Sequence, residues 1–176
     1  MNIYLMLVLA LYFPAGAGLI YQSARVSLLP ERIMSLALAI FCIELARMAV
    51  VDLHKASAVS SKKDNVLLEA SLNRFRTVVT STIVLELIGF YLALLFVSGG
   101  ASVVICSQLW FNLWVNVQLW PGLTPEVIPF ALRERIPVLL VNLLELVHLS
   151  LWRISSLQIW LASGMFALIL LFLMIK

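Results

Sequence analysis

The chain has 176 residues, of which 63% are hydrophobic and only 12% are charged. Its mean hydropathy is +1.07, whereas a water-soluble domain is roughly 45–50% apolar and about 25% charged. These values exclude a soluble globular protein. The sparse charge also excludes a disordered chain, and two cysteines are too few for a disulfide-based secreted scaffold. The composition therefore indicates an all-α, polytopic integral membrane protein.

Six stretches of the chain are apolar enough, or nearly so, to cross a membrane. A span needs about 20 mostly apolar residues, because the hydrocarbon core is ~30 Å thick and a helix rises ~1.5 Å per residue. The fifth stretch is the weakest, since it is short and holds three polar residues, so five spans with a re-entrant segment are the alternative. We expect a single transmembrane domain, a helical bundle with spans at about 2–22, 31–53, 77–98, 101–120, 136–152 and 157–175.

The first stretch resembles a signal peptide only in part. It is followed by Ala15-Gly16-Ala17, as at a cleavage site, but no Lys or Arg precedes its apolar run. We therefore expect a retained helix. Pro14 is expected to kink this helix, and Gly16 and Gly18 to let a neighbouring backbone approach closely.

The segment between the second and third spans divides into two parts. Residues 54–64 are small, polar and basic without an apolar period, which predicts a flexible cytoplasmic loop. Asp64 then has the character of an N-cap. Apolar residues recur after it at spacings of three and four, which predicts an amphipathic cytoplasmic extension of the third helix from about Asn65: Leu68, Leu72, Phe75 and Val79.

Two later connections carry helix-breaking residues. Gly99 and Gly100 form the whole predicted connection between the third and fourth spans, so these spans should be an antiparallel helical hairpin. The connection before the fifth span holds four prolines. Within it, Thr124-Pro125-Glu126 is typical of a helix start, and we predict a short interfacial helix there that ends before the last of these prolines.

The distribution of basic residues predicts the orientation of the spans. With six spans, one side holds nine of the 12 Lys and Arg residues and the other side holds Arg25, Arg32 and Arg153. Basic residues near span ends favour the cytoplasmic side. Both termini are therefore expected in the cytoplasm, together with these residues: Arg47, Lys55, Lys62, Lys63, Arg74, Arg76, Arg133, Arg135 and Lys176.

Ionisable residues inside the spans are the candidate functional residues, because a charge in the bilayer is costly. Glu44, Glu86 and Glu145 each fall in the middle half of a span when counted at ~1.5 Å per residue. Asn112 lies near the same depth on the fourth span, and its helical face also carries Gln108 and Asn116. The sequence therefore predicts a polar layer shared by four helices.

Two of these acids have a basic partner on the same helical face. Arg47 follows Glu44 by three residues, and His148 follows Glu145 by three. The simplest use is structural: buried ion pairs of Glu44 with Arg47, and of Glu86 or Glu145 with Arg47 or His148, would hold the bundle in register. Three glutamates nevertheless outnumber these two cations. One carboxyl is therefore expected to be protonated or to pair with a group outside the chain.

The pair Glu145 and His148 is also a weak candidate for a metal site. Glu-x-x-His with single glutamates on two other helices is half of the pattern that binds two metal ions in carboxylate-bridged proteins. The chain holds only one such pair. It lacks G-x-x-x-x-G-K-[ST], G-x-S-x-G, H-E-x-x-H and G-x-G-x-x-G, so nothing points to nucleotide binding, acyl transfer or a named cofactor.

These observations favour one function over two alternatives. We expect a non-enzymatic integral membrane subunit that acts by helix packing, with the lipid bilayer and other membrane subunits or a second copy as partners, and with no nucleic acid. The first alternative is a small transporter or channel component that uses the mid-membrane carboxylates as a proton or cation site. The second is a metal-dependent membrane enzyme. The residues on which these interpretations depend are Glu44, Arg47, Glu86, Asn112, Glu145 and His148.

Overall fold

The structure is a computed structural model that describes residues 3–60, 66–120 and 126–175. These residues form six α-helices, a two-stranded β-hairpin and two short 3₁₀ turns, Leu151–Arg153 and Ser155–Leu157. The helices are α1 (Ile3–Arg25), α2 (Leu29–Ser60), α3 (Val66–Ala93), α4 (Val97–Trp114), α5 (Leu132–Ser150) and α6 (Gln158–Ile175), and the strands are β1 (Val117–Trp120) and β2 (Glu126–Pro129).

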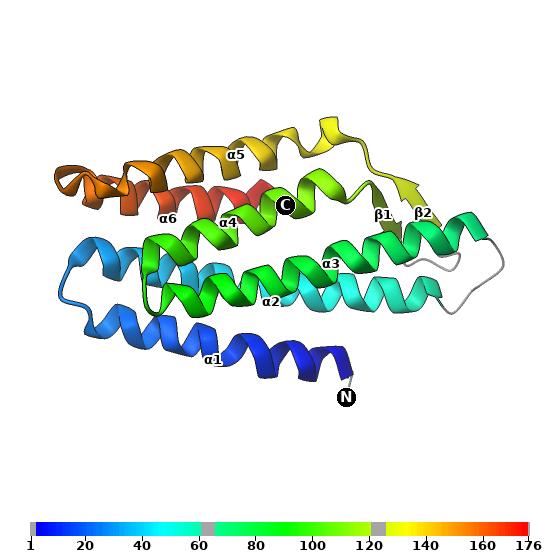
Figure 1. The fold of residues 1–176 in the computed structure, drawn as a ribbon, viewed down its shortest axis with the longest axis horizontal. Coiled ribbons are helices and arrows are strands. Elements are labelled where there is room, and N and C mark those ends of the chain that lie inside the picture. Colours follow the sequence, from blue (N-terminus) through cyan, green and yellow to red (C-terminus); the bar gives the residue numbers. More distant parts are fainter. Residues whose placement is uncertain (1–2, 61–65, 121–125, 176) are drawn as a thin grey trace.

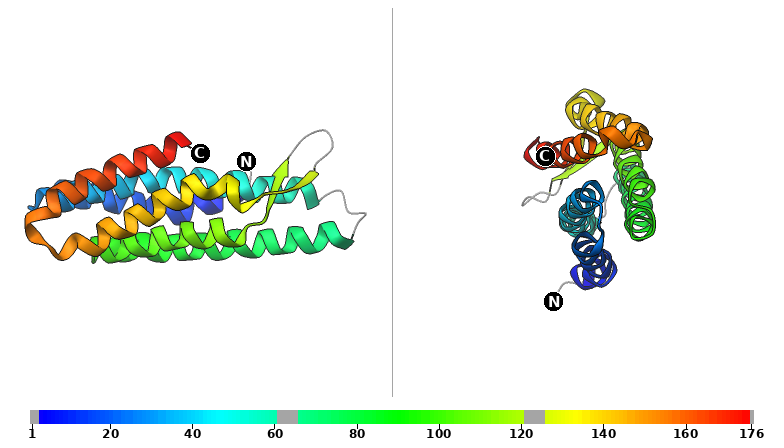
Figure 2. Two further views of the ribbon diagram at one scale, coloured as in Figure 1. Left: turned by 90° about the horizontal axis from the view of Figure 1, so that it is seen from above. Right: turned by 90° about the vertical axis from the view of Figure 1, so that its left-hand side faces the viewer.

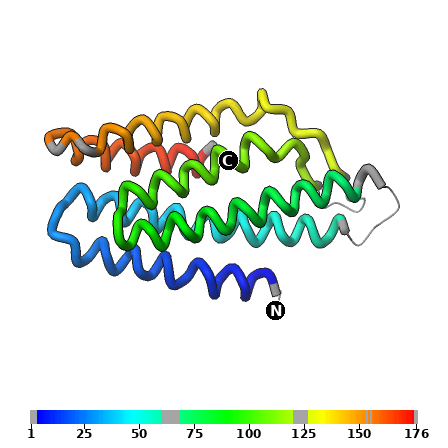
Figure 3. The backbone as a smooth tube through the Cα atoms, viewed as in Figure 1, coloured from blue at the N-terminus to red at the C-terminus, as the bar shows by residue number. Residues whose placement is uncertain are grey.

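The helices run antiparallel along one common direction (Figure 1). The connections 26–28, 94–96 and 151–157 lie toward the same end of the bundle, which we call the turn end (Figures 1 and 3). The β-hairpin lies at the other end, which we call the hairpin end, and α1 begins and α6 ends short of it (Figure 1). Figure 2 shows the bundle along its axis, and α2 packs against α1, α3 and α6. This arrangement confirms the predicted helical bundle.

Three helices in the described part of the chain are long and apolar enough to cross a membrane: Tyr4–Arg25, Leu29–Val59 and Glu69–Ala93. A shorter segment of α6, Gln158–Met174, is also apolar. Their apolar residues form the main core between the helices, where Leu19, Leu38 and Phe90 are fully buried. Phe41 of α2 meets Phe172 of α6 edge to face, with ring centroids 5.2 Å apart.

A second, smaller core lies at the hairpin end. It joins the last turns of α2, the first turns of α3 and the hairpin, and its buried members include Ala56, Val59, Leu72, Phe75 and Leu119. Two predictions depend on this core. The extension of the third helix is confirmed, because α3 is continuous from Val66, while the Asp64 N-cap lies outside the described residues.

The prediction that 54–64 is a flexible loop is wrong for its first seven residues, because α2 continues to Ser60. Ala56 and Val59 bury their side chains against α3, and this packing explains why the small, polar segment stays helical. Residues 61–64 lie outside the described part.

The connection between α3 and α4 also differs from the prediction, since it comprises residues 94–96 and both glycines lie inside α4. No described glycine has a positive φ, so the turn does not need glycine for its conformation. A Cβ atom at Gly100 would lie 2.2 Å from the Ala93 nitrogen, and one at Gly89 would lie 2.9 Å from the Val104 nitrogen. These glycines therefore serve the close packing of α3 on α4 rather than the turn.

The glycines of α1 play a different part from the one predicted. A Cβ at Gly16 would meet only the Cys42 sulfur at 3.6 Å, and one at Gly18 would meet the Leu94 side chain at 3.0 Å. The nearest neighbours are therefore side chains and not the backbone of another helix.

A β-hairpin stands where a short interfacial helix was predicted. Strand β2 pairs antiparallel with β1 in the register Val117↔Pro129 to Trp120↔Glu126. Val115 and Leu119 are buried whereas Asn116 and Gln118 are exposed, an alternation typical of a strand. The fourth helix therefore ends at Trp114 and not near residue 120, and α5 already begins at Leu132. Residues 121–125 lie outside the described part.

Candidate functional site

Glu86 of α3 is 4% exposed and accepts hydrogen bonds from side chains of two other helices. The Tyr12 hydroxyl of α1 donates a hydrogen bond to Glu86 Oε2. Gln108 Nε2 of α4 donates to Glu86 Oε1 at 2.6 Å. Three helices thus meet at one carboxyl group, and we call Tyr12, Glu86 and Gln108 the Glu86 cluster. The Cys42 thiol of α2 donates to the Tyr12 carbonyl at 3.6 Å, which brings a fourth helix to its edge.

A line of hydrogen bonds leads from this cluster toward α5. Asn112 lies one turn after Gln108 on α4, is also buried, and donates from Nδ2 to the Gln108 carbonyl at 2.8 Å. The Asn112 carbonyl accepts a hydrogen bond from Arg135 Nη1 of α5. Arg135 Nη2 donates to the Phe130 carbonyl at 2.6 Å, just after the hairpin. Arg135, although only 4% exposed, is therefore anchored by backbone carbonyls.

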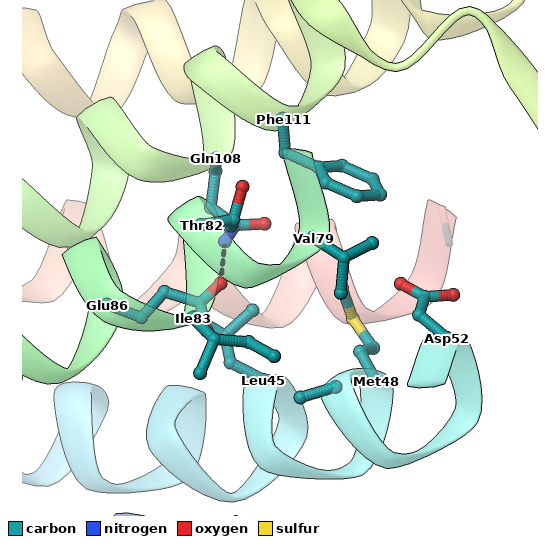
Figure 4. Close-up of a pocket in the computed structure, with 10 residues that line it drawn as sticks. Leu45, Met48, Asp52, Val79, Thr82, Ile83, Glu86, Gln108 and Phe111 are labelled. Carbon is teal, nitrogen blue, oxygen red and sulfur yellow. Dashed lines mark hydrogen bonds between the residues drawn. The ribbon is translucent and has the colours of Figure 1, made fainter. Parts of the chain in front are cut away.

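A small cavity adjoins the Glu86 cluster on its hairpin side (Figure 4). Its volume is about 20 Å³, which suffices for one water molecule. We call it the Glu86 cavity. Gln108 is 1% exposed, and its Oε1 atom has no hydrogen-bond partner among the described residues. The residues of α2, α3 and α4 that line the cavity include Leu45, Asp52, Thr82, Glu86, Gln108 and Phe111.

A larger recess of about 340 Å³ lies next to this cavity, between α2, α3, α4 and the hairpin. We call it the hairpin recess. Arg47, Asp52 and Lys55 of α2 line it together with apolar side chains of the second core. Asp52 borders both spaces, as do Met48 and Phe111. Asp52 therefore lies between the two spaces, whose walls are otherwise largely apolar.

The ion pair predicted between Glu44 and Arg47 is present on α2. Arg47 donates from Nη2 to Glu44 Oε1 at 2.5 Å and from Nε to Glu44 Oε2 at 2.8 Å. The prediction that this pair is buried is wrong, because the Arg47 side chain is 63% exposed and that of Glu44 is 21% exposed. Arg47 is exposed although it also lines the hairpin recess, and Glu44 beside it is only partly exposed.

Glu145 of α5 differs from Glu44 in both its burial and its hydrogen bonds. It is fully buried, and neither carboxyl oxygen has a hydrogen-bond partner among the described residues. The same holds for the side-chain amide of Asn142, one turn earlier on the helix. That one carboxyl is protonated or paired outside the chain stays a prediction, and Glu145 is a carboxyl without a hydrogen-bond partner among the described residues.

His148 does not pair with either acid in this structure. Its Nδ1 atom lies 2.8 Å from the Leu144 carbonyl of its own helix, and its ring packs against Gly164 of α6. In the part of the chain that is described, no three His, Cys, Asp or Glu side chains gather closely enough to hold a metal ion. The arrangement therefore gives Glu145 and His148 no further metal ligands.

The predicted polar layer is brought together only in part. Glu86, Gln108 and Asn112 are connected, while Glu44 pairs with Arg47 on α2 and Glu145 lies on α5 without a hydrogen-bond partner among the described residues. Asn116 follows the end of α4 and is exposed. Sequence reasoning missed Tyr12 and Asp52. Tyr12 could have been identified, because a tyrosine in the middle of an apolar helix is a polar group that needs a partner. Asp52 could not, because it lies at the end of a predicted span, where acidic residues are common.

Comparison of the chain with models of protein families, with curated proteins and with solved structures finds no match.

Proposed function

We propose that the protein is a non-enzymatic integral membrane subunit that crosses the bilayer six times and acts by packing against other membrane subunits or a second copy of itself. The hairpin end, with the basic residues of the longer loops, would face the cytoplasm. Within the chain, polar groups serve helix packing: the Glu86 cluster joins α1, α3 and α4. The six antiparallel helices and the apolar surface of the bundle support this proposal.

The observation that carries the proposal is the exposed ion pair on α2. Glu44 lies at the midpoint of the candidate span Leu29–Val59, and Arg47 follows one turn later. Ile43 and Leu36 of the same helix are exposed as well, so the pair interrupts an apolar outward surface. Arg47 also lines the hairpin recess, so the pair lies where this apolar surface meets the recess. A charged pair in a span is costly unless it faces protein or a water-filled space. A partner that offers polar groups would cover this surface.

The double variant Glu44→Leu/Arg47→Leu tests this role. We expect the parent to be recovered as a complex or homo-oligomer and the double variant as a monomer, measured by native mass spectrometry from mild detergent. The fold of the monomer should change little, because an exposed ion pair contributes roughly 0–1 kcal/mol to the free energy of unfolding. Arg74→Leu is the matched control, since Arg74 is an exposed cation of α3 at the hairpin end. The proposal would be contradicted by a parent that is monomeric in cross-linked native membranes. It would also be contradicted by a double variant that is recovered at the same assembled mass as the parent.

A second candidate function is a small transporter or channel component. The Glu86 cavity and the hairpin recess favour it, because Glu86 lines the first space, Arg47 and Lys55 line the second, and Asp52 lines both. In proteoliposomes, a pathway predicts proton or cation flux by the parent that is lost in Glu86→Gln or Glu145→Gln. The subunit role predicts that both variants assemble almost normally and that the parent gives no flux, because glutamine keeps the size and hydrogen-bonding capacity of glutamate but cannot titrate.

A further inference from the structure

Two shallow recesses lie end to end on the surface of α3, and together we call them the α3 groove. The first has a volume of about 660 Å³ and is bordered on one side by Trp110 of α4. The second has a volume of about 510 Å³ and lies closer to the turn end. Val84 lines both recesses, so the groove is continuous along the helix.

The lining of the α3 groove changes from polar to apolar along the helix. Toward the hairpin end it consists of one cation and three hydroxyl groups: Arg76, Thr77, Thr80 and Ser81. From Val84 onward its α3 residues are apolar except for Tyr91, whose hydroxyl donates a hydrogen bond to the Leu11 carbonyl of α1. The groove therefore has one polar and one apolar end, as a phospholipid molecule does.

The polar end of the groove lies at the depth expected for lipid headgroups. A hydrocarbon core of ~30 Å corresponds to about 20 helical residues, and counting back this far from Leu95, which is exposed at the turn end, reaches Arg76. Trp110 Nε1 donates to Ser81 Oγ at 3.0 Å, and tryptophan favours the boundary between headgroups and hydrocarbon. One leaflet, about ten residues deep, then extends from this boundary to about Leu87.

The charge of the polar end is positive. Arg76 is half-buried and donates from Nη2 to the Ala56 carbonyl of α2 at 3.4 Å. A guanidinium carries five N–H groups, so it can bind an oxyanion as well. Thr80 is exposed one turn later and places a hydroxyl on the same helical face. Among the described residues no Asp or Glu lines the groove, so it offers no acid to the ammonium group of a zwitterionic lipid.

We propose that the α3 groove binds an anionic phospholipid from the leaflet at the hairpin end. The lipid phosphate lies against the Arg76 guanidinium, whose planar N–H groups match phosphate oxygens, and against the Thr80 hydroxyl. One acyl chain lies along Val84 and Ile88. The inference requires that α3 crosses the bilayer but not that the chain assembles with another subunit, so it goes beyond the proposed subunit role and can fail independently of it.

The experiment measures which lipid stays bound to the full chain. The protein is reconstituted in vesicles of phosphatidylcholine with a minor share of phosphatidylglycerol, extracted in mild detergent and analysed by native mass spectrometry. We expect bound phosphatidylglycerol to be enriched over its share in the vesicles. Arg76→Leu should lower this enrichment about fivefold, because a basic residue at the membrane surface contributes about 1 kcal/mol to the attraction of anionic lipid. A parent without enrichment, or an Arg76→Leu variant with the enrichment of the parent, overturns the proposal.

Arg74→Leu is the matched control for the headgroup site. Arg74 is an exposed cation two residues before Arg76 on α3, and it does not line the groove. This variant should retain phosphatidylglycerol as the parent does. An equal loss in Arg74→Leu and Arg76→Leu would show that the basic residues of the hairpin end attract anionic lipid without a site, and would overturn the proposal as well.

A second pair of variants tests the apolar part of the groove. Val84 is 50% exposed where the two recesses meet, and Val84→Trp would fill the groove there. Leu140 of α5 is 55% exposed and lies outside the groove, so Leu140→Trp is the control. With circular dichroism showing both variants folded, Val84→Trp should lose the enrichment of phosphatidylglycerol and Leu140→Trp should keep it. Enrichment that persists in Val84→Trp would show that only the phosphate is bound, at the surface and without an acyl chain in the groove, and would contradict the proposal.

Discussion

Adding a single methyl group at Gly100 is expected to destabilise the bundle by roughly 1–3 kcal/mol or more, the range for overpacking a close-packed interior. A Cβ at this position would lie 2.2 Å from the Ala93 nitrogen and 2.4 Å from the Ala93 Cα. Both are backbone atoms, so no side chain can rotate away and α3 and α4 would have to separate. Thermal unfolding of Gly100→Ala in detergent, followed by circular dichroism, measures the effect.

Gly16→Ala is the matched control for this substitution. Gly16 also lies in a helix, but its Cβ would meet only the Cys42 sulfur at 3.6 Å, an ordinary contact distance. Alanine is favoured over glycine within a helix by up to about 1 kcal/mol, so this variant should be as stable as the parent or more so. Equal unfolding temperatures for the two alanine variants would show that α3 and α4 pack less closely in solution than they do in the structure.

Replacing Glu86 with leucine should have the second large effect. The substitution removes the acceptor of the Tyr12 hydroxyl and of Gln108 Nε2 while both donors stay buried. A hydrogen bond to a charged group contributes about 1.5–3 kcal/mol, so we expect the loss of about 3 kcal/mol or more. Glu86→Gln should be milder, since its amide oxygen still accepts a hydrogen bond. Unfolding by denaturant in mixed micelles compares the two.

A double-mutant cycle with Tyr12→Phe isolates the bond between α1 and α3. If Tyr12 and Glu86 are coupled as the structure shows, the two substitutions together should cost less than the total of their separate costs. Strict additivity would mean that the two side chains do not interact, and the Glu86 cluster would then not join α1 to α3.

The helices that follow from hydrophobic periodicity could be predicted, because a span must satisfy its backbone within one helix whatever its neighbours are. This holds for α1, α2, α3 and α6. The Glu44–Arg47 pair could also be predicted, since a spacing of three residues places both side chains on one helical face. These features depend on a single helix and not on how the helices are arranged.

Features that depend on tertiary neighbours could not be predicted in the same way. The strand at 117–120 follows α4 without a polar break, and an apolar run of this kind reads as a continuation of the span. The two glycines at 99 and 100 look like a turn unless the approach of Ala93 is known. In the candidate site, the depth of Glu86 was predictable. Its partners Tyr12 and Gln108 were not, because the sequence does not say which faces of α1 and α4 meet α3.

In the proposed topology, six helices cross the membrane and the three connections of the turn end lie on one side. In a chain without Cys42 and Cys106, single cysteines at Leu28, Leu95 and Ile154, all exposed in these connections, report on that side, and Asn73→Cys reports on the hairpin end. In intact cells, an impermeant thiol reagent should label all three turn-end cysteines, and should label Asn73→Cys only after permeabilisation. A turn-end cysteine that stays unlabelled until permeabilisation, or an Asn73→Cys that reacts in intact cells, would contradict this topology.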